Sequence, residues 1–309
     1  MKTILITGGA GFIGSNLAES LLGKGYFVIV IDNLQTGFVK NISHLDNSEN
    51  FTFIQADVNN YKEIAPVFFH NKVNFVFHYA AMVGVQHTLA NPLKVLNDIE
   101  GIKNILSLSK STGVERIFYS SSSEVYGENM DEVQNEDHTP LNSRLPYAAV
   151  KNIGEIYLKT YKKKYGLNFT IFRFFNTYGP KQSEDFVVAK FINQALCGKP
   201  ITINGDGKQS RTFCYIGDNI RATTNALESA KAINQIINIG SNCETSVDDL
   251  AKAILRLTGS ASAINYFPPL KEGDMRRRRP DIGKMKKMLG MDELISLDEG
   301  IKKTIEWQK

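Results

Sequence analysis

The first 32 residues combine a strand, a glycine-rich turn and a helix in the order that opens a parallel α/β sheet. Residues 2–6 form a short β-branched run typical of a buried strand, and glycines follow at Gly8, Gly11 and Gly14. Helical periodicity then begins, with apolar residues at Ile13, Leu17, Leu21 and Leu22. Because glycine has no side chain, free N–H groups and the positive end of the helix dipole can approach a negative charge. The turn therefore predicts a binding site for a diphosphate.

A second apolar run, residues 27–31, ends in Asp32. At this position a second parallel strand would bring a carboxylate to the ribose hydroxyls of a dinucleotide. The same charge would repel a 2′-phosphate, which favours NAD over NADP. A strand–helix turn without a ligand is the alternative for the glycine spacing alone. The strand before it, the helix after it and the acid together favour dinucleotide binding.

The alternation of strands and helices continues beyond Asp32. Further apolar runs and helical spacings lie at residues 50–57, 72–79, 92–108 and 116–119. This order predicts an α/β fold: a Rossmann doubly wound parallel sheet with a smaller C-terminal α/β substrate-binding lobe. The expected NAD-binding domain comprises residues 1–176 and 212–241, and the expected lobe comprises residues 177–211 and 242–309.

Polar or small residues follow three of the predicted strands. Asp57 and Val58 come where the polar edge of an adenine would lie, although a simple turn acid explains them equally well. Ala80 and Ala81 are small enough for a cofactor to lie against the backbone. The last of these strands ends in SSSSEVYG, residues 120–127, which would face the same cleft as the glycine turn because ligands bind beyond the carboxyl ends of such strands. A polar loop without a role is the alternative.

Tyr147 and Lys151 lie four residues apart at the start of a predicted helix behind Pro146. This spacing places a phenol and an ammonium on one helix face. A nearby positive charge favours the ionised phenol, so we expect Lys151 to lower the pKa of Tyr147 towards the range of a general base. Such a base can remove a proton from a sugar hydroxyl while hydride leaves the same carbon.

Composition excludes several other classes of protein. The net charge of +4 is mild and much of it lies in the arginine run 276–279, without the interleaved aromatics of a nucleic-acid surface. Three widely spaced cysteines support neither a disulfide framework nor a metal site, and we expect reduced, mostly buried thiols. The sequence shows no signal peptide and no apolar stretch of about 18 residues, which predicts a cytoplasmic protein that binds no membrane.

A series of motifs runs along almost the whole chain: TGGAGFIG, Asp32, Asp57-Val58, HYAA, SSSSEVYG, YAAVK, RFFNTYGP, INGDGKQSRTFCYIGD and GDMRRRRPDIGK. Their identity and order resemble those of extended short-chain dehydrogenases/reductases that act on nucleotide sugars. The resemblance implies NAD as the cofactor and a nucleotide-diphosphate sugar as the substrate. It also implies a homodimer joined by the helices that follow Asn91 and Tyr147.

The resemblance further implies roles for individual residues. Tyr147 would be the base at the C4 hydroxyl, Lys151 would bind the nicotinamide ribose, and Ser122 would hydrogen-bond the C4 oxygen. Other cofactor contacts would come from Gly8, Gly11, Phe12, Ile13, Gly14, Asp32, Asn33, Asp57, Val58, Tyr79, Ala80 and Ala81. Other substrate contacts would come from Val83, Ser123, Glu124, Asn176, Arg211 and Arg276.

Some positions leave room for other interpretations. Asn176 and Arg211 match residues that meet the substrate diphosphate, although Arg211 could instead be a surface ion-pair partner. Lys271 stands where many members of the family carry an arginine, so the phosphate contact is expected from the run 276–279. Asp98 stands where an asparagine is usual, which puts the polar contact of its helix in doubt.

The implied first step is oxidation at C4, which gives a 4-keto sugar, and several reactions can follow it. The favoured reading is a 4-epimerase, in which the ring turns over and takes hydride back on its other face. Because a ketone acidifies the C5 proton, Glu124 keeps open a UDP-glucuronate decarboxylase or a 4,6-dehydratase. Ser123, in the slot of an aspartate, disfavours one dehydratase type. A C4 dehydrogenase that releases the ketone and a non-catalytic NAD-binding protein are the remaining alternatives.

Overall fold

The computed structural model describes residues 1–309 except 85–87, 89, 128–132 and 270–276. Its largest element is a seven-stranded sheet of order β11-β6-β5-β4-β1-β2-β3, in which all neighbours pair in parallel. These strands are β1 (Thr3–Thr7), β2 (Phe27–Asp32), β3 (Phe51–Gln55), β4 (Val73–His78), β5 (Arg116–Ser122), β6 (Asn168–Phe174) and β11 (Gln235–Ile239). From β1 the chain adds β2 and β3 on one side, and it then returns to add β4 and the later strands on the other side. The boundary between β1 and β4 is the switch point at which open α/β sheets form a ligand crevice.

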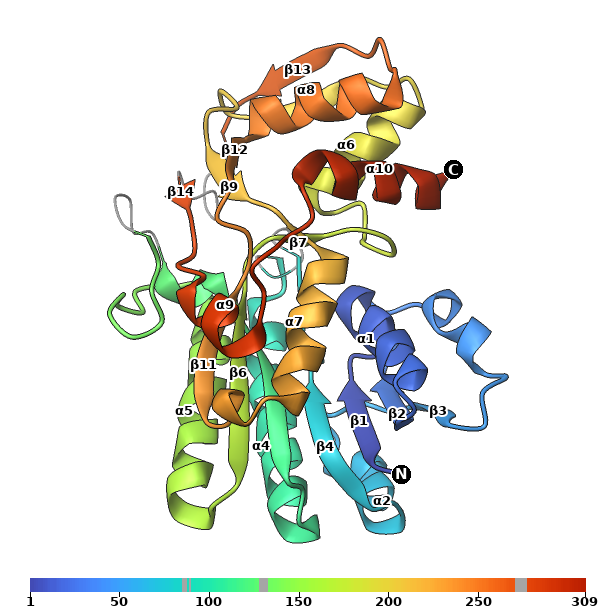
Figure 1. Ribbon diagram of the computed structural model, residues 1–309, viewed down its shortest axis with the longest axis vertical. Helices are drawn as coiled ribbons and strands as arrows, with labels where there is room; N and C mark the ends of the chain where they lie inside the picture. The colour runs from blue at the N-terminus through green and yellow to red at the C-terminus, as the bar shows by residue number, and fades with distance from the viewer. Residues whose placement is uncertain (85–87, 89, 128–132, 270–276) are drawn as a thin grey trace.

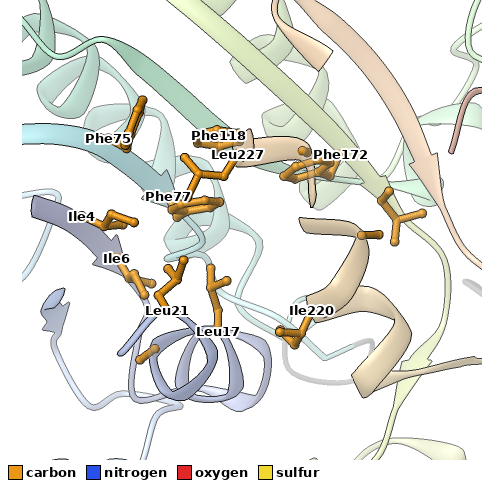
Figure 2. Close-up of a cluster of buried hydrophobic side chains, with 14 of the residues drawn as sticks. Ile4, Ile6, Leu17, Leu21, Phe75, Phe77, Phe118, Phe172, Ile220 and Leu227 are labelled. Carbon is orange, nitrogen blue, oxygen red and sulfur yellow. The ribbon is translucent and has the colours of Figure 1, made fainter. Parts of the chain in front are cut away.

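Helices cover both faces of this sheet (Figure 1). One face packs against α1 (Phe12–Gly23), α7 (Ile216–Glu228) and α9 (Gly283–Leu289). The other packs against α2 (Tyr61–His70), α4 (Pro92–Thr112) and α5 (Pro146–Tyr165). Because side chains alternate along a strand, Ile4 and Ile6 belong to the first core whereas Leu5 belongs to the second. Figure 2 shows the first core, where the rings of Phe77 and Phe118 stack with centroids 4.3 Å apart.

The ends of the two long helices follow from their sequences. Pro92 and Pro146 stand in the first turns of α4 and α5, where a missing N–H costs nothing. Gly113 and Gly166 end the same helices in the left-handed conformation, each with φ of 76°. These signals fix α5 so that its first turn carries Tyr147.

A smaller lobe lies at one end of the sheet (Figure 1). Its helices are α6 (Val187–Leu196), α8 (Val247–Thr258) and α10 (Leu297–Gln308), which share a separate apolar core. Its short strands form the pairs β7 (Thr177–Tyr178) with β10 (Cys214–Tyr215) and β8 (Ile201–Asn204) with β13 (Ile264–Phe267), and the group β12 (Glu244–Ser246), β9 (Ser210–Thr212) and β14 (Arg277–Arg278). Single turns complete the chain at η1 (Val39–Asn41), η2 (Ser43–Leu45), η3 (Ser123–Tyr126) and η4 (Ala230–Ala232).

The sheet and its helices confirm the predicted fold class, and one expectation about the cysteines is wrong. Cys214 is buried, but Cys197 and Cys243 are exposed because they lie at a helix end and in a loop of the lobe. No helix in the described ranges is long and apolar enough to cross a membrane. The described residues also contain no cluster of three histidine, cysteine, aspartate or glutamate side chains that could hold a metal ion.

Candidate active site

A cavity of about 770 Å³ lies at the carboxyl ends of the sheet strands and extends to the lobe. The glycine turn, the ends of β2, β4 and β5 and the first turns of α5 line it, and Phe186, Phe213 and Arg278 line it further along the chain. Of the predicted site residues that the structure describes, all line this cavity except Arg211. Arg276 and Lys271 lie outside the described residues.

The glycine turn has no room for side chains. Gly8 has a φ of 70°, and a Cβ atom on it would lie 2.7 Å from the backbone nitrogen of Ala80. A Cβ atom on Gly14 would overlap the carbonyl oxygen of Gly8. Gly11 is the N-cap of α1 and leaves the first N–H groups of that helix without a side-chain acceptor of its own. This cradle fits the diphosphate of a dinucleotide.

Asp32 is held firmly at the end of β2. Its carboxylate accepts hydrogen bonds from the backbone N–H groups of Ala10 (3.0 Å) and Leu34 (2.8 Å). Burial raises the pKa of Asp32, and these two bonds act against that rise. Beside it, the Asn33 amide donates to the Asp57 carboxylate at 3.3 Å. Both carboxylates therefore line the part of the cavity next to the glycine turn, as a ribose and an adenine would require.

Tyr147, Lys151 and Ser122 meet further along the cavity. The Lys151 ammonium, 3% exposed, donates to Ser120 Oγ at 3.3 Å and lies 5.6 Å from the centre of the Tyr147 ring. Ser122 Oγ accepts the backbone N–H of Glu124 at 3.1 Å and also hydrogen-bonds the Tyr147 phenol. The structure thus brings a phenol, an ammonium and a hydroxyl from α5 and β5 into one group.

The pKa of Tyr147 shifts in the direction opposite to the sequence-based expectation. Burial raises this pKa and the Glu124 carboxylate raises it further, whereas the hydrogen bond from Ser122 and the Arg278 guanidinium lower it. Desolvation outweighs the nearby positive charge, because a buried phenolate loses its hydration. Burial also lowers the pKa of Lys151 to about 8, against the opposing effect of the Asp98 carboxylate.

An ion pair between Glu124 and Arg278 lines the same region. Arg278 Nη1 lies 3.0 Å from Glu124 Oε1 and donates to Ser123 Oγ at 3.3 Å. The arginine side chain is 6% exposed and the glutamate 17%, so the pair is largely removed from water. Its two partners come from η3 and from β14, which are 154 positions apart in the chain (278 minus 124).

Two cavity residues, Arg278 and Asp98, were not predicted individually, and Arg211 lies away from the cavity wall. Within the arginine run 276–279, the residue predicted to contact the substrate was Arg276. In the structure Arg278 lines the cavity, whereas Arg277 forms an ion pair with Glu244 at 2.6 Å. Arg211 lies on β9 as the register partner of Arg278 and is not among the residues that line the cavity. Asp98, whose departure from asparagine was the available signal, accepts the Met82 N–H at 2.8 Å and lines the cavity.

Asn176 and the lobe complete the wall. Asn176 donates to the carbonyl oxygen of Thr212 at 3.3 Å and lines the cavity, and its predicted contact with the substrate diphosphate stays a prediction. Phe186 and Phe213 are apolar wall residues that were not predicted, although Phe213 lies within the motif INGDGKQSRTFCYIGD.

Comparisons with known proteins agree with this geometry. The pattern of the family described as "NAD dependent epimerase/dehydratase family" matches residues 4–240. The chain is 36% identical to UDP-glucuronic acid decarboxylase 1 of Danio rerio, over 99% of this chain and 72% of that protein. It is 37% identical to a putative UDP-glucose 4-epimerase of Methanocaldococcus jannaschii, over 99% of this chain and 98% of that protein.

Solved structures are similar over the whole chain. The UDP-glucose 4-epimerase of Thermotoga maritima with UDP-glucose has a TM-score of 0.93 and 35% identity, over 99% of this chain and 98% of that one. The UDP-glucuronic acid 4-epimerase of Bacillus cereus, in complex with UDP-glucuronic acid and NAD, has a TM-score of 0.91 and 32% identity, with the same coverage.

Proposed function

The chain belongs to the NAD dependent epimerase/dehydratase family and is an NAD-dependent nucleotide-sugar enzyme, and we propose that it is a nucleotide-sugar 4-epimerase. The observation that carries the proposal is the grouping of Tyr147, Ser122 and Lys151 in one cavity with the glycine turn. We assign NAD binding to residues 1–176 and 212–241 and sugar-nucleotide binding to the remainder.

The residues of the cavity can carry out the oxidation at C4. When bound, NAD supplies the hydride acceptor, and the glycine turn and Asp32 would hold its diphosphate and ribose. Tyr147 would take the proton of the C4 hydroxyl while Ser122 holds the oxygen by a hydrogen bond. Lys151 would bind the nicotinamide ribose. The hydrogen bond with Ser122 and the positive charge of Arg278 act against the raised pKa of Tyr147. C4 would be inverted if the cavity lets the 4-keto ring turn its other face to the cofactor and Tyr147 returns the proton to the C4 oxygen.

The ion pair of Glu124 and Arg278 favours a second candidate reaction. A 4-ketone makes a carboxylate on C5 a β-keto acid, which loses carbon dioxide and then takes a proton at C5. The planar guanidinium of Arg278 suits a carboxylate, and Glu124 lies beside it as a proton donor or acceptor. Decarboxylation of a nucleotide uronic acid is therefore the alternative to epimerisation.

One experiment separates the two reactions. The protein is incubated with NAD and, in turn, UDP-glucose, UDP-N-acetylglucosamine, UDP-glucuronate and a GDP-sugar, and the products are identified by NMR. An inverted C4 with all carbons retained is the expected result. Release of carbon dioxide from UDP-glucuronate would replace epimerisation by decarboxylation, and Glu124→Gln should then slow the protonation at C5 and so the formation of the pentose product. A deoxy-keto product would contradict both.

Activity should fall as the pH rises through about 8. Burial lowers the pKa of Lys151 to about 8, so the ammonium carries its charge below this pH and loses it above. Asp98 opposes that effect, and Asp98→Asn should therefore move the alkaline limb of kcat to lower pH. The measurement is kcat at saturating substrate from about pH 5 to about pH 10. An unchanged limb in Asp98→Asn, with exposed Asp292→Asn as the control, would contradict this role for Asp98.

We also propose a homodimer through α4 and α5. These helices pack side by side and expose Leu93, Leu96 and Ile156 to solvent. Burial of such side chains against a second copy would stabilise a dimer by about 25 cal/mol per Å² of apolar surface. We therefore expect Ile156→Arg to shift the protein from dimer to monomer in sedimentation experiments. Phe69→Arg, an equally exposed position on α2, should leave the dimer intact.

A further inference from the structure

A row of polar side chains crosses three adjacent strands at the edge of the site, where its first member, Ser121, lines the cavity. Ser121 on β5 pairs in register with Arg173 on β6, which pairs in register with Asn238 on β11. The three side chains therefore lie at one level of the sheet, near its carboxyl end. Each is at most 2% exposed. Burial of polar groups is costly unless they are hydrogen-bonded, so the bonds of this row indicate what it holds in place.

Glu155 on α5 anchors one end of the row. Its carboxylate accepts Arg173 Nε at 2.9 Å and Nη2 at 2.7 Å, and Ser121 Oγ donates to it at 2.6 Å. Glu155 follows Tyr147 and Lys151 at successive intervals of four residues and so shares their helix face. The bidentate pair therefore ties the face of α5 that carries Tyr147 and Lys151 to β6, and the hydrogen bond from Ser121 ties it to β5.

Tyr126 links the row to the loop that carries Glu124. Arg173 Nη1 donates to the Tyr126 hydroxyl at 2.9 Å, and this hydroxyl donates to Asn238 Oδ1 at 2.8 Å. Tyr126 is fully buried in η3, the turn that also contains Glu124. The position of Glu124 is thus set from two sides, by Ser121 before it and by Tyr126 after it.

Asn238 links the row to the segment that carries Arg278. Its amide donates to the carbonyl oxygens of Gln134 at 2.8 Å and Asp281 at 3.2 Å. Gln134 in turn donates its N–H to the carbonyl oxygen of Arg279 at 2.8 Å. The residues immediately after Arg278 are therefore fastened to the same row.

We propose that this polar row, defined as Ser121, Arg173 and Asn238 with Glu155 and Tyr126, positions the reacting groups of the site. It holds Tyr147 and Lys151, Glu124, and Arg278 at fixed separations. Of its members only Ser121 lines the cavity, so Tyr126→Phe tests the positioning role without changing a cavity residue. The inference rests on the proposed C4 oxidation. A displacement of about 1 Å can lower an enzymatic rate by about a hundredfold, so loosening the row should lower kcat more than it weakens substrate binding.

Two conservative variants test the proposal. Ser121→Ala and Tyr126→Phe each remove one hydroxyl of the row and keep the Arg173–Glu155 pair. The control is Ser109→Ala on α4, which removes a fully buried hydroxyl that has no hydrogen-bond partner in the described part of the chain. For each variant we would measure kcat, KM, the single-turnover rate of hydride transfer and the urea midpoint of unfolding. We expect kcat and the hydride-transfer rate to fall about tenfold or more in the two row variants, with KM within about twofold, and no such loss in Ser109→Ala.

The outcomes distinguish this inference from the proposed function. If both row variants keep kcat within about twofold of wild type, the row is only structural, whatever happens to the urea midpoint. If Tyr147→Phe, assayed in parallel, is fully active, the proposed function is wrong instead. Should wild type convert no nucleotide sugar, crystal structures still decide: in Tyr126→Phe the distance between Glu124 Oε1 and Arg278 Nη1 should exceed about 4 Å, and an unchanged distance would overturn the positioning role.

Discussion

Tyr147→Phe should lower kcat about a thousandfold on any nucleotide sugar that the wild type converts. The substitution removes only the phenolic oxygen, which hydrogen-bonds Ser122 in the cavity, and it leaves the partly buried ring packed at the first turn of α5. Loss of a general base costs about 10²- to 10⁴-fold in rate, whereas the binding of substrate through its nucleotide should hardly change. The measurement is steady-state turnover together with the affinity for the nucleotide sugar by calorimetry.

A tyrosine on the same helix supplies the control. Tyr165→Phe removes an exposed hydroxyl from the last turn of α5 and should leave kcat unchanged. If Tyr147→Phe retained more than about a tenth of wild-type kcat, another group would have to accept the C4 proton, and the mechanism proposed above would be wrong.

Gly14→Ala should weaken NAD binding at least about tenfold and destabilise the protein by about 1–3 kcal/mol. The added Cβ would overlap the carbonyl oxygen of Gly8 and crowd Gly9 Cα, and both are backbone atoms that cannot rotate away. The turn must therefore move, and with it the N–H groups that would hold the diphosphate. NAD affinity by calorimetry and the urea unfolding free energy measure the two effects.

Gly23 provides the matched substitution in the same helix. A Cβ on Gly23 meets no atom within 4 Å, so Gly23→Ala should leave NAD affinity unchanged and stabilise α1 by about 0.5–1 kcal/mol. Equal losses in both variants would show that the close approach at Gly14 has no part in cofactor binding.

The sheet could be predicted because its signals are local. Residues 2–6, 27–31 and 72–79 are mainly apolar runs, as is typical of strands buried on both faces, and the structure places strands in all three. The same reasoning located Tyr147 and Lys151, because a spacing of four and a preceding proline suffice to define a helix face. The pattern stopped at residue 119, whereas β5 continues to Ser122, since serines carry no apolar signal.

The remaining features depend on contacts between distant parts of the chain. Arg278 enters the cavity because β14 pairs in parallel with β9, and neither strand exceeds three residues, too short for a periodic pattern. The direction of the Tyr147 pKa shift depends on how completely the fold buries the phenol, which spacing along a helix does not reveal. A sequence therefore gives the identity of such groups more readily than their ionisation.

The polar row also bears on how this chain can change over evolutionary time. Substitution of Arg173 alone would leave the buried Glu155 carboxylate without its counter-ion, and substitution of Glu155 alone would leave the buried guanidinium without one. Each single change should lower the free energy of unfolding by about 3–5 kcal/mol. Because of this loss of stability, a substitution at either position should be retained only when the other position changes as well. Across homologues, these two sites should covary as a unit, even as the outward-facing residues of the same helix diverge freely.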